Sequence, residues 1–183
     1  MLLIEFYAGG LYPFLPVDQA ELVDSTYHLG ILDKNLMKNL KFALEESRQI
    51  NTPIEIIDKI FITQLMKYNM TFDFSPIMKN IIKQHGNINI SDLAFPYYYS
   101  ERQTRRLFLR YAGINPKKLT RIARANYALK LIKNQKSTFL DISNEAGYFD
   151  QAHFFHEFKI INGITPLEYK QNMSVFYNDK TRI

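Results

Sequence analysis

The chain has no cysteine, no tryptophan and no long apolar run, and these absences exclude several classes of protein. Without cysteine it forms no disulfide framework, thiolate zinc site, iron–sulfur cluster or cysteine nucleophile. No stretch approaches about 18 uninterrupted apolar residues, so we expect no membrane-spanning helix. The first residues carry an acid at Glu5 and no basic segment. We therefore expect no signal peptide and predict a cytoplasmic protein.

The sequence also lacks the phosphate-binding, zinc-protease and nucleophile-elbow motifs that mark common enzyme families. Of its four histidines, only His153 and His156 have a spacing at which two side chains on one helix can ligate a metal. No third ligand is obviously placed to complete that site. We therefore predict a protein that is not an enzyme and has no metal site and no cofactor.

Charge is distributed unevenly along a chain that is otherwise apolar enough, at 46% hydrophobic residues, to bury a core. Residues 1–73 contain six Lys and Arg against ten Asp and Glu, whereas residues 74–183 contain seventeen against eight. A basic half is typical of proteins that bind nucleic acid. Taken alone it is weak evidence, because many basic segments are merely solvated surfaces.

Local patterns divide the chain into three parts, which we predict as residues 1–73, 74–172 and a tail at 173–183. Glycines, prolines and aromatic residues over residues 1–23 predict short strands and turns. Apolar residues at helical spacing predict a pair of helices, one over about residues 33–47 and one starting at Pro53. The remainder has a helical pattern almost throughout.

The basic part contains an internal repeat. The segment Ala112-Gly-Ile-Asn-Pro116 recurs fifty positions later as Asn162-Gly-Ile-Thr-Pro166, and Phe108 corresponds to Phe158 by the same offset. Upstream, a polar residue followed three positions later by an acid occurs in both copies, a pattern that favours a helix start. Three matched pairs in the same order indicate a duplicated unit.

Each copy has the pattern of a short helix, a tight turn and a second helix, which is the helix-turn-helix arrangement. In the second copy, Gly147 ends the short helix and Asp150 caps the next one. In the first copy, the second helix runs from Ser100 to Tyr111 and presents arginines beside its apolar face. Arginine reads guanine bidentately and also clamps phosphate, so this helix is a candidate DNA reader.

Several segments carry a family resemblance: Asp92-Leu-Ala94, Ser100-Glu-Arg-Gln103, Arg106-Leu-Phe108, Gly113-Ile-Asn-Pro116, Gly147-Tyr-Phe-Asp-Gln-Ala-His-Phe154 and Gly163-Ile-Thr-Pro-Leu-Glu-Tyr169. From about Ser75 to Asn172 the sequence resembles the DNA-binding domain of the AraC/XylS family of transcriptional regulators. The resemblance implies a mainly α fold with two helix-turn-helix units joined by a long helix, here about residues 116–134. It also implies binding to two successive major grooves of duplex DNA, with RNA polymerase as a possible partner.

Residues 6–14 are similar to the closing strands of the β-barrel sensor domain found in some members of this family. The resemblance therefore implies a short sensor remnant, with an unknown small-molecule effector. Helices in the position of residues 33–67 connect sensor and DNA-binding domain in the family and often form a homodimer. The alternative is that these helices only cover the remnant.

Departures from the family pattern affect the predicted site. Pro96 lies inside the expected first helix and should end it near Phe95, and Tyr98 stands where the family often has glycine. His156 and Ala152 occupy the positions that match Arg106 and Arg102 in the repeat. The first unit should therefore supply most base readout, and the second should mainly fix the register.

The candidate residues follow from the repeat and the resemblance together. We expect His153 to hold structure more than to read a base, and His156 to contact DNA. The candidate DNA contacts are Arg102, Arg105, Arg106, Arg110, Lys117, Arg121, Gln151, His153, His156 and Thr165, and the candidate turn residues are Gly113, Gly147 and Gly163. The alternative function is a protein-interaction module, derived from such a regulator, that has lost specific DNA binding.

Overall fold

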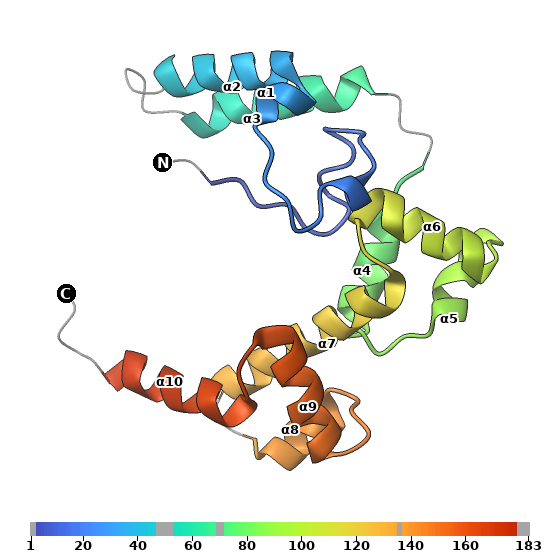
Figure 1. Cartoon of the computed structure of the whole chain (residues 1–183), viewed down its shortest axis with the longest axis vertical. Helices are drawn as coiled ribbons and strands as arrows, with labels where there is room; N and C mark the ends of the chain where they lie inside the picture. The colour runs from blue at the N-terminus through green and yellow to red at the C-terminus, as the bar shows by residue number, and fades with distance from the viewer. Residues whose placement is uncertain (1–2, 47–52, 69–71, 135–136, 179–183) are drawn as a thin grey trace. The chain divides into compact units, whose positions relative to one another are not determined.

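A computed structural model describes residues 3–46, 53–68, 72–134 and 137–178, shown in Figure 1. The part of the chain so described is mainly helical and contains no strand, which confirms the predicted fold class. The break in the helical pattern at residues 69–75, where we place the predicted domain boundary, lies partly outside these residues, at 69–71, and so does the end of the predicted tail, at 179–183. The elements are η1 (Gln19–Glu21), α1 (Leu29–Leu32), α2 (Lys34–Glu46), α3 (Pro53–Lys67), α4 (Ser75–Lys83), α5 (Ile90–Ala94), η2 (Phe95–Tyr97), α6 (Glu101–Ala112), α7 (Pro116–Lys133), α8 (Phe139–Glu145), α9 (Gln151–Asn162) and α10 (Pro166–Asn178).

The short strands predicted for residues 1–23 are not observed in residues 3–23, and this prediction was wrong. Turns use the backbone groups that a strand would need. The amide of Gly10 donates to the carbonyl of Tyr7 at 2.7 Å, and the amides of Phe14 and Leu15 both donate to the carbonyl of Leu11 at 3.0 Å. Local hydrogen bonds of this kind compete directly with a ladder.

Contacts divide the chain into two compact units, which we describe separately. Unit 1 comprises Met1–Met78 and Tyr99–Asn115, and unit 2 comprises Lys79–Tyr98 and Pro116–Ile183. Unit 1 thus contains α6, whereas unit 2 contains α5 and α7 to α10. The linear division into residues 1–73, 74–172 and 173–183 stays a prediction.

In unit 1, α2 packs against α3 through the buried side chains of Leu36, Ala43 and Ile57. Gln64 ties this pair to its surroundings, because its amide nitrogen donates to Asp33 Oδ2 at 2.8 Å and to the carbonyl of Phe14 at 2.9 Å. Burial raises the pKa of Asp33, but hydrogen bonds from Leu36, Gln64 and Lys67 outweigh it and lower that pKa to about 2.

An aromatic cluster in unit 1 fixes the position of α6. Phe74 meets Phe108 edge to face with ring centroids 5.0 Å apart, and it stacks on Tyr111 at 5.6 Å. Tyr12, from the N-terminal segment, also packs against Tyr111, with its ring centroid 4.2 Å away. These contacts bury one face of α6 and hold its backbone against the N-terminal segment.

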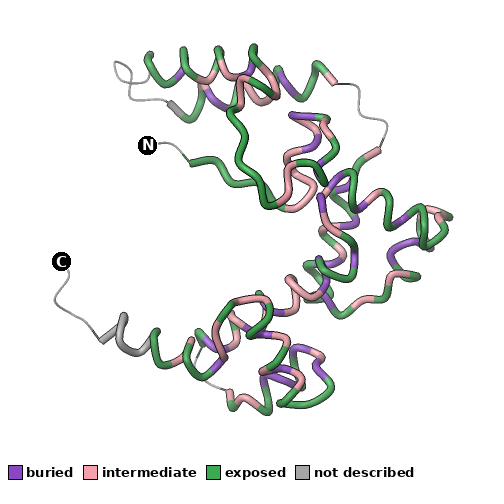
Figure 2. Tube along the Cα trace, in the orientation of Figure 1, coloured by how far each residue is buried: buried purple, intermediate pink, exposed green. Residues whose placement is uncertain are grey.

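In unit 2, the long helix α7 packs against α8, α9 and α10. The core combines Ala128 and Ile132 of α7 with Ile142 of α8 and Phe154 and Phe158 of α9. Figure 2 shows buried positions recurring along α7 and α9 at helical spacing. This packing determines which side of α9 remains exposed.

Candidate nucleic-acid interface

Helix α6 has well-defined ends. Ser100 caps it in a capping box, in which the Ser100 amide donates to Gln103 Oε1 at 2.8 Å and the Gln103 amide donates to Ser100 Oγ at 3.3 Å. Gly113 ends the helix with a φ of 74°, and its amide donates to the carbonyl of Leu109 at 2.9 Å. Caps of this kind satisfy backbone groups that a helix end otherwise leaves without partners.

The exposed side of α6 carries the arginines predicted from the sequence. Thr104, Phe108 and Tyr111 are buried, while Arg102, Arg105 and Arg106 are exposed. Arg105 is 3.5 Å from Glu101 one turn earlier, and both side chains are more than half exposed, so this pair contributes little. Three guanidinium groups therefore project from one short helix into solvent.

Arg110, near the end of α6, contacts the N-terminal segment. Its Nε donates to the Tyr12 hydroxyl at 2.8 Å, and its guanidinium carbon lies 5.7 Å from the centre of that ring. This hydrogen bond raises the pKa of Arg110 above its ordinary value. Tyr12 was not among the residues singled out from the sequence, because it lies 98 positions from its partner.

Helix α9 repeats the design of α6 with different side chains outside. Asp150 caps it by accepting from the His153 amide at 2.7 Å, and Gly163 ends it with a φ of 77°. His153 Nδ1 accepts from the Phe149 amide at 3.2 Å, so its ring supports the helix start. The exposed side chains of α9 are Gln151, Ala152, His156, Lys159 and Ile160.

The remaining candidates in unit 2 lie on α7 and before α10. Lys117 is exposed in the first turn of α7. Arg121 pairs with Glu157 of α9 through Nε at 2.5 Å and a second nitrogen at 3.1 Å. This bidentate pair uses the guanidinium of Arg121 to hold α9 against α7. Sequence spacing alone gave no signal for Glu157, which is 36 positions away.

Polar caps also start helices α8 and α10 of unit 2. Thr165 forms a box with Glu168, whose carboxylate accepts from the Thr165 amide at 2.6 Å and from its hydroxyl at 2.8 Å. These two hydrogen bonds lower the pKa of Glu168. Thr138 and Asp141 form the corresponding box at α8, where hydrogen bonds from Thr138 lower the pKa of Asp141. Gly147, which follows α8, has a φ of 72°.

The candidates thus fall into separate groups. Unit 1 brings four arginines together on α6, three exposed on its outer side and Arg110 held by Tyr12. Unit 2 places Gln151, His153 and His156 on α9 and Lys117 and Arg121 on α7, with Thr165 capping α10.

Comparison with known proteins finds matches in the same part of the chain that contains α6 to α9. Residues 93–172 match the family model of a helix-turn-helix domain. An uncharacterised HTH-type transcriptional regulator of Escherichia coli (strain K12), YidL, is 36% identical over 94 residues, which cover 49% of this chain. These two matches support the resemblance of this part of the chain to an AraC/XylS-like regulator. The chain spans about a third of the length of that curated relative, 32%.

The described residues show neither a metal-binding cluster nor a membrane-spanning helix. Within the described ranges, no group of three His, Cys, Asp or Glu side chains lies close enough to hold a metal ion. None of the helices described combines the length and apolar character that crossing a membrane requires.

Proposed function

We propose that the chain binds duplex DNA sequence-specifically as a transcriptional regulator of the AraC type, with α6 and α9 each entering a major groove. The observation that carries this proposal is the arginine side of α6. Arg102, Arg105 and Arg106 are exposed on a helix that is capped at both ends and buried on its opposite side. The membership of residues 93–172 in a helix-turn-helix family supports the same reading.

The chemistry of α6 suits base readout. A guanidinium group donates two parallel hydrogen bonds to O6 and N7 of guanine, and no other base pair presents that pattern in the major groove. Arg106 points away from the buried side and is the best-placed reader, with Arg102 one turn earlier. We assign Arg105 to a phosphate contact, which leaves Arg102 and Arg106 as the proposed readers.

The chemistry of α9 suits positioning. Ala152 offers only a methyl group and His156 a smaller hydrogen-bonding ring, so we propose that α9 reads little and fixes the register. Lys117 and the backbone at the start of α10 after Thr165 add phosphate contacts. We leave Arg121 out of the proposed contacts because Glu157 uses its guanidinium.

The test starts with duplexes selected from a random pool and measures affinity by fluorescence anisotropy over a range of salt. We expect a linear fall of log affinity with log salt, and a specific site at least about a thousandfold tighter than random duplex. Arg106→Ala should weaken specific binding by about 1–3 kcal/mol and relax preference at one base pair. Lys38→Ala, which removes the same charge from α2, should change neither the affinity for the selected duplex nor the base preference.

Two outcomes would contradict the proposal. Equal affinity for selected and random duplexes would favour the alternative, a protein-interaction module without specific DNA binding. A uniform loss for Arg106→Ala on all sequences would make Arg106 a phosphate contact. A homodimer through residues 33–67, an effector and a contact with RNA polymerase stay predictions from the family resemblance.

A further inference from the structure

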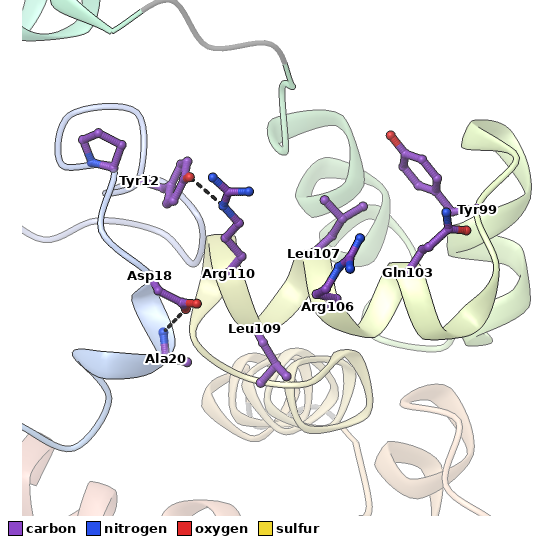
Figure 3. Close-up of a pocket in the computed structure, with 10 residues that line it drawn as sticks. Tyr12, Asp18, Ala20, Tyr99, Gln103, Arg106, Leu107, Leu109 and Arg110 are labelled. Atoms are coloured by element: carbon purple, nitrogen blue, oxygen red, sulfur yellow. Dashed lines mark hydrogen bonds between the residues drawn. The ribbon is translucent and has the colours of Figure 1, made fainter.

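A pocket of about 860 Å³ opens on the side of α6, between this helix and the N-terminal segment, as Figure 3 shows. Its lining residues all belong to unit 1. The volume lies within the range of about 300–1,000 Å³ that is usual for small-molecule sites. Nothing in the proposed contact with DNA requires a hollow at this place.

The walls of the pocket combine charge with apolar surface. Arg106 and Arg110 supply two guanidinium groups, and Asp18 supplies one carboxylate, so the lining carries one net positive charge. Pro16 and Leu107 add apolar surface, and further lining is provided by Tyr12, Ala20, Tyr99, Gln103 and Leu109. A ligand that fits should therefore be a monoanion with an apolar body, because a dianion would exceed the net charge and meet Asp18.

Two of the three charged groups of the pocket, Arg110 and Asp18, are held in place before a ligand arrives. Tyr12 is only 3% exposed and packs at a tilt against Tyr111, and its hydroxyl accepts from Arg110 Nε. Asp18 Oδ1 accepts from the Ala20 amide at 3.0 Å. The bond to Tyr12 uses one of the five N–H donors of a guanidinium group, so Arg110 retains donors for a carboxylate. Groups fixed in this way cost a ligand little ordering on binding.

We propose that this pocket binds a small monoanionic carboxylate with an apolar body, and that this ligand competes with duplex DNA for Arg106. The second half rests on the proposed function, because it assigns Arg106 to DNA. The first half does not. A carboxylate paired with Arg106 neutralises the guanidinium and occupies its donors, so the loaded protein has one DNA contact fewer.

Calorimetric titration of the full chain tests the pocket with three probes. Hexanoate has the charge and the apolar body, hexanol has the body without the charge, and inorganic phosphate has a charge without the body. We expect hexanoate to bind with a Kd of about 1 mM, the scale for so small a ligand. Hexanol and phosphate should each bind about tenfold more weakly or not measurably. No hexanoate binding, or equal binding of either other probe, would overturn the proposal.

Two matched arginine variants separate this proposal from the proposed function. Arg106→Gln should weaken hexanoate binding about tenfold, whereas Arg102→Gln, on the same helix but outside the pocket, should leave it unchanged. Both substitutions are at exposed positions, so unchanged circular dichroism should verify folding. Equal hexanoate affinity of the two variants would remove Arg106 from the site and overturn the proposal.

Competition is then measured on the wild-type chain with a selected duplex. Hexanoate at saturation should weaken DNA binding about tenfold, and the Arg106→Gln variant should lose this sensitivity. If hexanoate binds without changing the affinity for DNA, the proposed competition is overturned, whereas the proposed binding of a carboxylate in the pocket stands. If no duplex is bound specifically, the proposed function fails and the hexanoate titration still decides the pocket.

Discussion

Helices α6 and α9 end at glycines fifty residues apart, Gly113 and Gly163, and each buries a phenylalanine completely, Phe108 and Phe158. Their outer sides differ, because α6 presents arginines where α9 presents Ala152 and His156. Packing tolerates little change in volume, so the inner side of a duplicated helix keeps its pattern. The outer side faces no such constraint and is free to acquire a different role.

The largest expected effect tests the likeness of the inner sides. Phe108→Ala and Phe158→Ala should each cost about 3–5 kcal/mol, because both rings are fully buried. Urea denaturation measures the loss in the free energy of unfolding, and hydrogen exchange of amides in α6 and in α9 then shows which helix is affected. Phe149, which is 89% exposed, is the matched control, and its replacement by alanine should cost less than about 0.5 kcal/mol. A loss under about 1 kcal/mol at either core position would show that the two inner sides are not equivalent.

The next effect separates two glycines with the same backbone conformation. A Cβ at Gly113 would lie 2.7 Å from the carbonyl oxygen of Gln19 and 2.6 Å from Val23 Cγ2, whereas a Cβ at Gly163 would meet nothing within 4 Å. Both substitutions by alanine cost about 1 kcal/mol for positive φ. Gly113→Ala should lose at least about 1 kcal/mol more from the clash. Equal losses of stability for the two variants in thermal denaturation would mean that Gln19 and Val23 do not pack against Gly113 at the end of α6.

Exchange of the outer side chains should alter DNA binding by a smaller amount. His156→Arg places a permanent charge on α9 at the position that matches Arg106 of α6, so affinity for a selected duplex should rise by up to about 1 kcal/mol. The salt slope should steepen by about one phosphate equivalent. The reciprocal variant, Arg106→His, should weaken binding and flatten the slope. If His156→Arg leaves affinity and slope unchanged, α9 does not face the DNA.

The smallest effect distinguishes the caps by their response to acid. The box of α6 uses the neutral Gln103, whereas those of α8 and α10 use Asp141 and Glu168, whose pKa values are lowered by hydrogen bonds from Thr138 and Thr165. A lowered carboxyl pKa stabilises the folded state above the ordinary carboxyl range, and this contribution is lost as pH falls through the folded-state pKa. As pH falls below the ordinary carboxyl pKa, amide protection should therefore fall at residues 138 and 165, whose amides donate to these carboxylates, but not at residue 100, whose amide donates to Gln103. Asp141→Asn should remove the pH response of amide protection at α8 and leave that at α10. If the response at α8 persists in this variant, groups other than the Asp141 carboxyl cause it.

Much of the helical part follows from local sequence signals. Pro53 and Pro116 stand at the first positions of α3 and α7, and Pro96 precludes continuation of α5, which ends at Ala94. The strands expected in residues 1–23 are not formed because turn hydrogen bonds within residues 7–15 outweigh the aromatic composition. The periodicity of apolar residues depends only on near neighbours in the sequence. It therefore identifies a helix or strand better than it identifies the element against which that helix or strand packs.

The pairs that shape the candidate site are the part that sequence could not provide. Arg110 with Tyr12 and Arg121 with Glu157 join residues 98 and 36 positions apart. Both arginines look like exposed basic residues in the sequence, and only the packing of other elements brings an acceptor to each. The same holds for the pocket beside Arg106, whose opposite wall comes from residues 12–20.

The central claim is that α6 supplies most of the sequence readout while α9 mainly positions the domain. Selection of duplexes from a random pool by the wild-type chain, by Arg106→Ala and by His156→Ala tests it most directly. We expect a site with one informative half and one weak half, in which Arg106→Ala removes preference at a position of the informative half and His156→Ala changes neither half. Two equally informative halves, or loss of the informative half in His156→Ala alone, would contradict it.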